Sequence, residues 1–250
     1  MSRHGSRFLS RAAAMAVGRR LFVEGQQPGV VEALKAGRSV LNSRFDALLP
    51  PGIRRFSARH WTPVQVAKRA AELLVEDSKS MILDIGSGAG KFCIVGALTT
   101  PGQFVGVEQR SSLHRTACGI ADKFSIPRVQ FLNSRMEDVD WGQFSGFYLF
   151  NPFYENIAET IRMDQAVEFS ESRYKECIEL VRSKLSGARP GTRVVTYYGF
   201  GGEFPRGFSL QYREPIATSA LELWIKDVES LSVSVPDRWN FPRDHNGVTP

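Results

Sequence analysis

The stretch MILDIGSGAGK, residues 81–91, decides the fold of this chain. Met81 to Ile85 is a short apolar run of the kind that forms a buried strand, and a turn with glycine at positions 86, 88 and 90 follows it. Glycine in such a turn lets backbone N–H groups come close to a ligand. A helical pattern begins straight afterwards, and the positive end of that helix suits an anionic or polar ligand.

A second apolar run, Phe104 to Val107, ends in the acid Glu108 about twenty residues after the turn. An acid at the end of the second strand is placed to accept hydrogen bonds from the two hydroxyls of a ribose. Two strands, a glycine turn and this acid therefore predict a nucleoside-binding βαβ unit.

The spacing of the glycines narrows the choice of nucleoside. A dinucleotide fingerprint needs G-x-G-x-x-G/A, and counting from Gly86 puts the bulky cation Lys91 at its last position. This disfavours a dinucleotide oxidoreductase. The D-x-G-x-G-x-G spacing from Asp84 to Gly90 instead resembles motif I of the class I S-adenosylmethionine-dependent methyltransferases. The resemblance continues in order along roughly residues 60–227, through GVEQR (106–110), NSRMED (133–138) and FNPFYEN (150–156).

The resemblance implies an α/β fold with a Rossmann-like, mostly parallel seven-stranded sheet, an antiparallel edge strand and helices on both faces. We expect a basic, partly helical N-terminal extension over residues 1–60, the methyltransferase domain over 61–228 and a polar tail over 229–250. The implied cofactor is S-adenosyl-L-methionine.

The cofactor has a methionine end, a ribose and an adenine ring, and the resemblance assigns residues to each. Asp84 is expected near the ammonium group, directly or through water, and Met136 against the adenine ring. Glu137, or the adjacent Asp138, would accept a hydrogen bond from the exocyclic amine; an ordinary loop with a helix cap is the open alternative there. The full expected set is Asp84, Gly86, Ser87, Gly88, Glu108, Gln109, Met136, Glu137 and Asn151.

FNPFYEN supplies the expected catalytic residues, Asn151, Pro152, Phe153 and Tyr154. Pro152 fixes its own φ and holds Asn151 out of helical conformation, which can aim the Asn151 side-chain oxygen and a backbone carbonyl at one point. Two such acceptors orient the N–H bonds of an amine nucleophile, and an aromatic face from Phe153 or Tyr154 can hold a planar substrate or a cationic product.

This segment is similar to the NPPY/NPPF motif of methyltransferases that act on adenine, guanine or glutamine nitrogens, with Phe153 in place of the second proline. It is also similar to the corresponding part of the non-SET lysine methyltransferases. We therefore expect in-line methyl transfer to a nitrogen on a protein or nucleic acid. Two alternatives stay open: that NPFY only turns the chain and fills the core, and that the protein is a non-catalytic S-adenosylmethionine-binding partner or assembly protein.

The formal net charge of +6 is unevenly distributed. Residues 1–60 hold 11 Lys/Arg against 3 Asp/Glu, whereas residues 61–250 hold 21 against 23. Such a basic segment fits either an organellar transit peptide or an arm that touches phosphates or an acidic protein surface, and its length favours an integral arm. The arm makes a macromolecular methyl acceptor the preferred partner, and a small-molecule acceptor stays open.

The three cysteines at 93, 118 and 177 are scattered and suggest neither a disulfide framework nor a metal site. No apolar stretch approaches the roughly 20 residues of a membrane span. We expect a reducing compartment and a cytoplasmic protein, with organellar import through the arginine-rich N-terminus as an open alternative.

Local patterns predict several further elements. Thr62-Pro63-Val64-Gln65 predicts a helix running to about residue 76, with Thr62 as its N-cap. Helical spacing is expected over 30–49, ended by LLPPG, and over 163–185. A pair of strands, 209–213 and 221–227, is expected to be joined through Pro215.

Two histidines and three other aromatic residues complete the set of candidates. His60 and Trp61 precede the capped helix and could line the substrate mouth, with a structural role as the alternative. Tyr197 and Tyr198 could border the pocket or belong to the core, and His114 is expected to face solvent.

Overall fold

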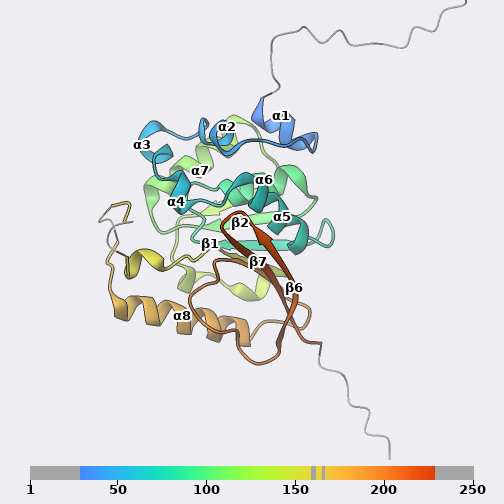
Figure 1. Cartoon of the computed structure of the whole chain (residues 1–250), viewed down its shortest axis with the longest axis vertical. Coiled ribbons are helices and arrows are strands. Elements are labelled where there is room, and N and C mark those ends of the chain that lie inside the picture. The colour runs from blue at the N-terminus through green and yellow to red at the C-terminus, as the bar shows by residue number, and fades with distance from the viewer. Residues whose placement is uncertain (1–28, 159–161, 165–166, 229–250) are drawn as a thin grey trace, which may run out of the picture.

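A seven-stranded sheet forms the centre of the molecule (Figure 1). The computed structural model describes residues 29–158, 162–164 and 167–228, so the predicted arm up to residue 28 and the predicted tail 229–250 lie outside these ranges. The strand order is β3-β2-β1-β4-β5-β7-β6. The strands are β1 Met81–Ile85, β2 Gln103–Val107, β3 Val129–Leu132, β4 Gly146–Leu149, β5 Arg193–Tyr197, β6 Phe208–Ile216 and β7 Ser219–Lys226.

Helices cover both faces of the sheet (Figure 1). Helices α5, α6 and α7 lie on one face with the short helices α1–α4 outside them, and α8 lies on the other. The helices are α1 Val30–Lys35, α2 Asn42–Asp46, α3 Pro51–Arg54, α4 Ser57–His60, α5 Val64–Leu74, α6 Lys91–Thr99, α7 Ser111–Lys123 and α8 Glu171–Ser186, with 3₁₀ turns η1 Met136–Asp138, η2 Trp141–Gln143 and η3 Tyr154–Asn156.

Strand β1 has parallel partners on both sides, β2 and β4, and the chain order reverses across it. Ligands of open α/β sheets bind where the order reverses, at the carboxyl ends of the strands. Strand β7 runs antiparallel between β5 and β6. The predicted Rossmann-like, mostly parallel seven-stranded sheet with an N-terminal helical extension is therefore confirmed.

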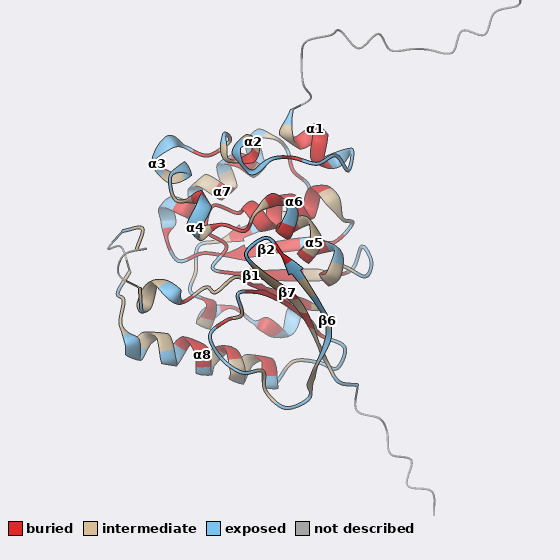
Figure 2. Ribbon diagram, in the orientation of Figure 1, coloured by how far each residue is buried: buried red, intermediate tan, exposed pale blue. Residues whose placement is uncertain are grey.

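Two cores, one on each face, hold the helices to the sheet (Figure 2). Alternate residues of β1 serve them, since Ile82 packs toward α5 and α6 whereas Leu83 and Ile85 pack toward α8. Helix α6 is buried almost all round because α1 and α2 cover its outer side, and α8 shows the stripe of buried residues of a surface helix. No helix in the described ranges is both long and apolar enough to cross a lipid bilayer.

The C-terminal strand pair differs from its prediction. Pro215 lies inside β6, opposite Ala220, and not in the connection, which is the turn at Ala217 and Thr218. Proline is tolerated there because β6 is an edge strand and needs hydrogen bonds on one side only.

The capping box predicted at Thr62 was wrong. Helix α5 begins at Val64, whose backbone N–H donates to the side-chain oxygen of Asn42 at 2.7 Å. The Thr62 hydroxyl is buried and forms a 2.8 Å hydrogen bond with the Tyr148 hydroxyl. A residue of the N-terminal extension thus satisfies a donor at the start of the helix, which local sequence spacing does not reveal.

The two longer helices predicted outside the sheet were too long. The region 30–49 forms α1 and α2, and Pro50 and Pro51 begin α3 rather than only ending a helix. Helix α8 begins at Glu171, not at Met163, because Ser170 is its N-cap and accepts from the Arg173 N–H at 3.0 Å.

Lys91, the residue that disfavoured a dinucleotide site, fastens the N-terminal extension to the domain. Its ammonium is buried and contacts Asp46 Oδ1 at 2.8 Å and Asn42 Oδ1 at 3.3 Å, above the ring of Phe45. Burial lowers the pKa of Lys91, and the hydrogen bond and charge of Asp46 oppose that shift. The helix that follows the glycine turn is therefore tied to α2.

Replacing Asp46 by Asn should lower the free energy of unfolding by about 3 kcal/mol, because a buried ammonium loses its countercharge. The double variant Asp46→Leu, Lys91→Met should recover most of that loss. Urea denaturation measures both, with Glu171→Gln, at an exposed ion pair on α8, as the neutral control. An unchanged midpoint for Asp46→Asn would show that the pair does not hold the extension.

Candidate functional site

A cleft of about 640 Å³ opens at the carboxyl ends of the parallel strands. The turn after β1, the loop after β2, the start of η1 and the segment after β4 form its floor, and α4 and the start of α8 form its sides. Ten of the predicted site residues line it: Gly86, Gly88, Glu108, Gln109, Met136, Glu137, Asn151, Pro152, Phe153 and Tyr154. Two, Asp84 and Ser87, do not.

The glycine turn is packed from several sides. Gly88 has φ +55°, and a Cβ there would overlap the indole nitrogen of Trp61, while a Cβ at Gly90 would overlap Phe131. The Gly86 and Ser87 N–H groups both donate to the Val107 carbonyl at 3.0 Å. The glycines therefore serve close packing against neighbouring side chains as well as close backbone approach to the cleft.

Glu108 connects the two halves of the predicted nucleoside site. Its carboxylate accepts from the Gly88 N–H at 3.0 Å through Oε2 and from the Arg110 N–H at 2.7 Å through Oε1. The side chain is 5% exposed, and burial is the main reason that its pKa is raised, although both backbone hydrogen bonds oppose the shift. Each oxygen has a second acceptor direction, so the carboxylate can still receive a ligand diol at the cleft.

Asp84 lies behind the turn and not on the cleft wall. It is buried, and its Oδ2 accepts from the Cys93 thiol at 3.5 Å. Burial raises the pKa of Asp84 to about 7, with the nearby charge of Glu108 adding to the shift. Because Asp84 does not line the cleft, its carboxylate does not face a ligand there directly. Contact through water stays a prediction.

The Ser87 side chain also faces away from the cleft. Its hydroxyl is buried without a hydrogen-bond partner among the described residues, and it packs over Gly106 of β2. Its backbone N–H donates to Val107 and its carbonyl accepts from Gly90, so its role in binding stays a prediction.

The residues predicted to bind adenine, all in the segment after β3, have different surroundings. Met136 is buried and lines the cleft. Glu137 lines it too, but its carboxylate is ion-paired with Arg173 of α8 and, at 2.7 Å, with Arg135. Burial alone would raise the pKa of Glu137, yet hydrogen bonds and these arginines lower it overall. The Glu137 carboxylate therefore attaches α8 to the β3 loop, and the alternative Asp138 does not line the cleft.

Asn151 has the left-handed conformation, with φ +39°. Its N–H donates to the Gly199 carbonyl at 2.9 Å, and its carbonyl accepts from Tyr154 N–H at 3.3 Å. Asn151 lines the cleft, and its hydrogen bonds to described residues are all made by its backbone. The backbone is thus held on both sides while the polar side chain stays available, a combination typical of functional positions.

The two aromatics after Pro152 have different surroundings. Phe153 is buried in the α8-side core and reaches the cleft with part of its ring, whereas Tyr154 is 44% exposed at the cleft mouth. Trp61 and His60 also line the cleft, as the sequence suggested. Tyr154 is therefore the aromatic face that an incoming molecule can reach.

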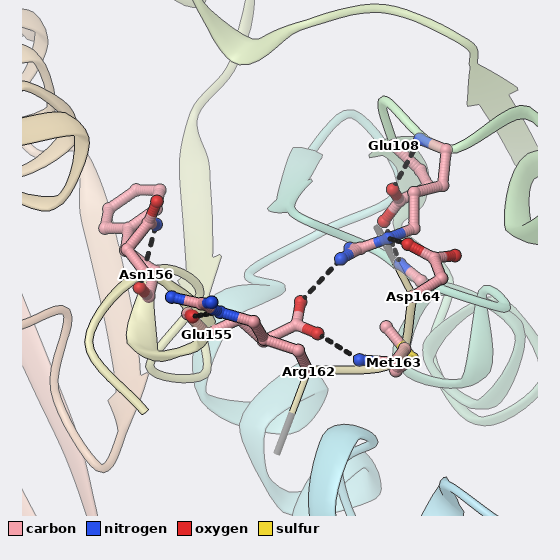
Figure 3. A network of polar contacts seen from close by, with 9 residues as sticks. Glu108, Glu155, Asn156, Arg162, Met163 and Asp164 are labelled. Carbon is pink, nitrogen blue, oxygen red and sulfur yellow. Dashed lines mark hydrogen bonds and ion pairs between the residues drawn. The ribbon is translucent and has the colours of Figure 1, made fainter. Parts of the chain in front are cut away.

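Sequence reasoning did not identify a polar network that connects these loops (Figure 3). The guanidinium of Arg110 is buried and contacts Glu155 Oε2 at 2.9 Å and Asp164 Oδ1 at 3.1 Å. Glu155 Oε1 in turn accepts from the Met163 N–H at 2.9 Å, and the Arg162 side chain donates to the Glu155 carbonyl. Because Arg110 N–H also donates to Glu108, one residue links the predicted ribose acid to the Asn151 segment.

Three other predicted placements were resolved by the structure. Tyr197 is buried in the core, and Tyr198 is exposed and donates to the Thr218 carbonyl, outside the cleft. His114 is only half-exposed and contacts the Phe131 carbonyl and Cys118, so the expectation that it faces solvent was wrong. Within the described ranges, no group of three or more His, Cys, Asp or Glu residues is arranged to hold a metal ion.

Comparison with known proteins identifies the fold. No family model and no curated protein matches the chain. Among solved structures, the chain is similar to an RNA methyltransferase from Salinibacter ruber in complex with S-adenosyl-L-homocysteine, with 20% identity, a TM-score of 0.50, and 74% of this chain and 99% of that chain covered. It is also similar to TrmN from Thermus thermophilus, with 14% identity, a TM-score of 0.53, and 70% of this chain and 52% of that chain covered.

At these identities the likenesses show the fold. The chain has the Rossmann-like fold of the class I methyltransferases. The match to the Salinibacter ruber protein spans nearly all of that chain, and the match to TrmN spans about half of it.

The buried Asp84 predicts a pH dependence of stability. Its pKa of about 7 lies above the ordinary 3.8, so between about pH 4 and pH 7 the unfolded chain releases a proton that the folded chain keeps. This group therefore makes the free energy of unfolding fall as pH rises through that window. Asp84→Asn removes this effect. The free energy of unfolding of the variant, relative to that of the native protein, should therefore rise between pH 4 and pH 7, by up to about 4 kcal/mol.

Denaturant titrations of both proteins at pH 4.5, 6 and 8 measure the difference. The raised pKa of Glu108 is present in both proteins, so the difference reports Asp84 together with its interaction with Glu108. A difference that stays constant across this range would mean that Asp84 ionises normally in the folded protein.

Proposed function

We propose that this protein is an S-adenosylmethionine-dependent methyltransferase that transfers the methyl group in line to a nitrogen acceptor on a macromolecule. One observation carries the proposal: Glu108, whose carboxylate is hydrogen-bonded to the glycine turn, and Asn151, whose hydrogen bonds to described residues are all made by its backbone, line the same cleft. The Glu108 carboxylate suits the ribose of a nucleoside, and the Asn151 amide suits the methyl acceptor.

The residues of the cleft fit the cofactor. Glu108 supplies a buried carboxylate with remaining acceptor capacity for a ribose diol, and Met136 supplies an apolar surface for an adenine ring. Gly86 lines the cleft with φ +75°, and a Cβ there would lie 3.5 Å from Pro152 Cβ, so the missing side chain leaves room for the methionine end to approach the backbone. Gln109 lines the cleft beside Glu108 and can add a polar contact to the ribose.

The cofactor supplies an activated methyl group on a sulfonium sulfur. This chain's contribution is then to position the acceptor, which accounts for most of the acceleration in such transfers. The Asn151 side-chain oxygen is a hydrogen-bond acceptor that can fix one N–H bond of an amine. A backbone carbonyl of the same segment can fix a second N–H bond, so that the nitrogen lone pair faces the methyl carbon.

A nitrogen acceptor is favoured because Asn151 and Pro152 present acceptors and no general base. Among the described residues that line the cleft, the carboxylates of Glu108, Glu137 and Glu155 are held by backbone N–H groups or arginines, and Glu176 contacts Arg173 and Ser172. Glu168 and His60 line the cleft as well, on the α8 and α4 sides, and an oxygen acceptor would need one of these groups to take its proton. An amine attacks through its own lone pair, which the hydrogen-bond acceptors of Asn151 and Pro152 can orient.

The second candidate is a non-catalytic S-adenosylmethionine-binding module that serves a partner protein. The side chains of Asn151 and Tyr154 argue for catalysis, because neither is needed to close the core. Binding of S-adenosylhomocysteine without any label transfer to protein, nucleic acid or small molecules would favour the binding module.

Glu108→Gln should weaken S-adenosylhomocysteine binding at least tenfold, because it removes a charged acceptor from the ribose diol. Isothermal calorimetry measures this, and Glu72→Gln, at an exposed acid of α5, is the control and should bind normally. Equal affinity of Glu108→Gln and the native protein would remove Glu108 from the ribose role.

Asn151→Gly should lower turnover at least a hundredfold and change S-adenosylhomocysteine affinity less than threefold. Glycine tolerates φ +39°, so this variant removes the amide without the backbone strain that alanine would add. The measurement is transfer of labelled methyl from S-adenosylmethionine into whole-cell extract. Parallel losses of binding and turnover would contradict the assignment of Asn151 to the acceptor.

A further inference from the structure

We propose that the methyl acceptor is a single-stranded or unpaired segment of nucleic acid whose phosphates lie along a basic surface beside the cleft. This surface, the arginine wall, consists of Arg54 at the end of α3, Arg55 directly after it, and Arg59 and His60 of α4, of which Arg59 and His60 line the cleft. The inference rests on the proposed methyltransferase function and names the class of its substrate.

The arginine wall has no acidic residues of its own. Between Asp46 and Glu72 the chain contains no Asp or Glu. Arg54, Arg55 and Arg59 are exposed, and none of them forms an ion pair with a described residue. Arg54 donates to the Ala47 and Leu49 carbonyls, which fixes its position without neutralising its charge. The wall thus keeps its positive charge facing solvent.

The other arginines of the cleft are neutralised. Arg110 is paired with Glu155 and Asp164, and both Arg135 and Arg173 contact Glu137. Of the arginines that line the cleft, Arg59 is the one without an ion-pair partner among the described residues. A polyanion that reaches the cleft is therefore attracted to the α4 side, away from Glu168 and Glu176 on the segment around the start of α8.

The wall and the acceptor site share one opening. Arg59 and His60 line the same cleft as Asn151 and Tyr154, with α3 and α4 on one side of the carboxyl edge of the sheet and α8 on the other (Figure 1). The half-exposed Tyr154 ring offers a face on which a base can stack. A nucleic acid meets both requirements, since its phosphates pair with arginines while a planar base enters the cleft. An acidic protein surface provides anions without the planar ring.

Entry of a base into the cleft favours an unpaired segment of nucleic acid. A base must leave its stack before its amino nitrogen can enter a cleft that ends at buried residues such as Phe153 and Met136. Unpaired nucleotides avoid that cost. The shared chemistry of RNA and DNA, phosphates with an exocyclic amine on a base, is what the wall and Asn151 recognise.

Binding of fluorescent 20-nucleotide single strands of RNA and of DNA tests the proposal by anisotropy at several salt concentrations. Arg55→Glu, Arg59→Glu should weaken binding at least tenfold and reduce the slope of log affinity against log salt by about 1.4, the value for two lost phosphate contacts. Arg189→Glu, Arg206→Glu is the matched control, because it changes the net charge equally at exposed positions at the opposite edge of the sheet. The control should stay within twofold of the native protein.

S-adenosylhomocysteine affinity, measured on the same proteins, separates this inference from the proposed function. It should be unchanged in both double variants. Normal cofactor binding with no affinity for either strand, equal loss in the two variants, or labelled methyl found in protein would overturn the nucleic-acid assignment while leaving the methyltransferase proposal standing. Stronger binding of the RNA strand or the DNA strand identifies which source supplies the acceptor.

Discussion

The hydrogen bond from the Gly88 N–H to the Glu108 carboxylate is the constraint on which the rest of the site depends. It joins the turn after β1 to the end of β2 inside a buried environment, where an unpaired carboxylate would be costly. The bond also fixes Gly88 beneath Trp61, and Trp61 leads directly into α5. One interaction therefore sets the shape of the cleft at the glycine turn and the position of Trp61, which lines it just before α5 begins.

Two buried cations connect the glycine turn and the loop after β2 to other segments of the chain. Lys91, at the first position of α6, holds α2 through Asp46, so the N-terminal extension packs on the core of the domain. Arg110, two residues after Glu108, holds Glu155 and Asp164, so the segment after Asn151 is placed relative to Glu108. Each of these pairs fixes where two separate segments meet, and breaking one would leave a buried charge without a partner. Arg59 of the extension and Asn151 thus come to line one cleft.

Much of this could be predicted from the sequence, and the limits have physical causes. The strands, the glycine turn and the cleft residues from Gly86 to Tyr154 follow from local patterns, since strand ends of a parallel sheet meet at one edge. Spacing could not show that Asp84 and Ser87 face away from the cleft, because both lie where the strand passes into the turn. Nor could it show that the Glu137 carboxylate pairs with Arg173, or that Arg110 pairs with Glu155, because 36 and 45 residues separate these partners. Long-range partners likewise displaced the predicted cap at Thr62, since Asn42 satisfies Val64 instead.

We propose above all that Glu108 binds the ribose of the cofactor and that Asn151 positions the methyl acceptor in the same cleft. A crystal structure of the protein with S-adenosylhomocysteine tests this most directly. We expect both ribose hydroxyls within hydrogen-bond distance of the Glu108 carboxylate, the adenine against Met136, and the sulfur facing the Asn151 amide. A ligand bound with its ribose away from Glu108, or with its sulfur turned away from Asn151, would contradict the account.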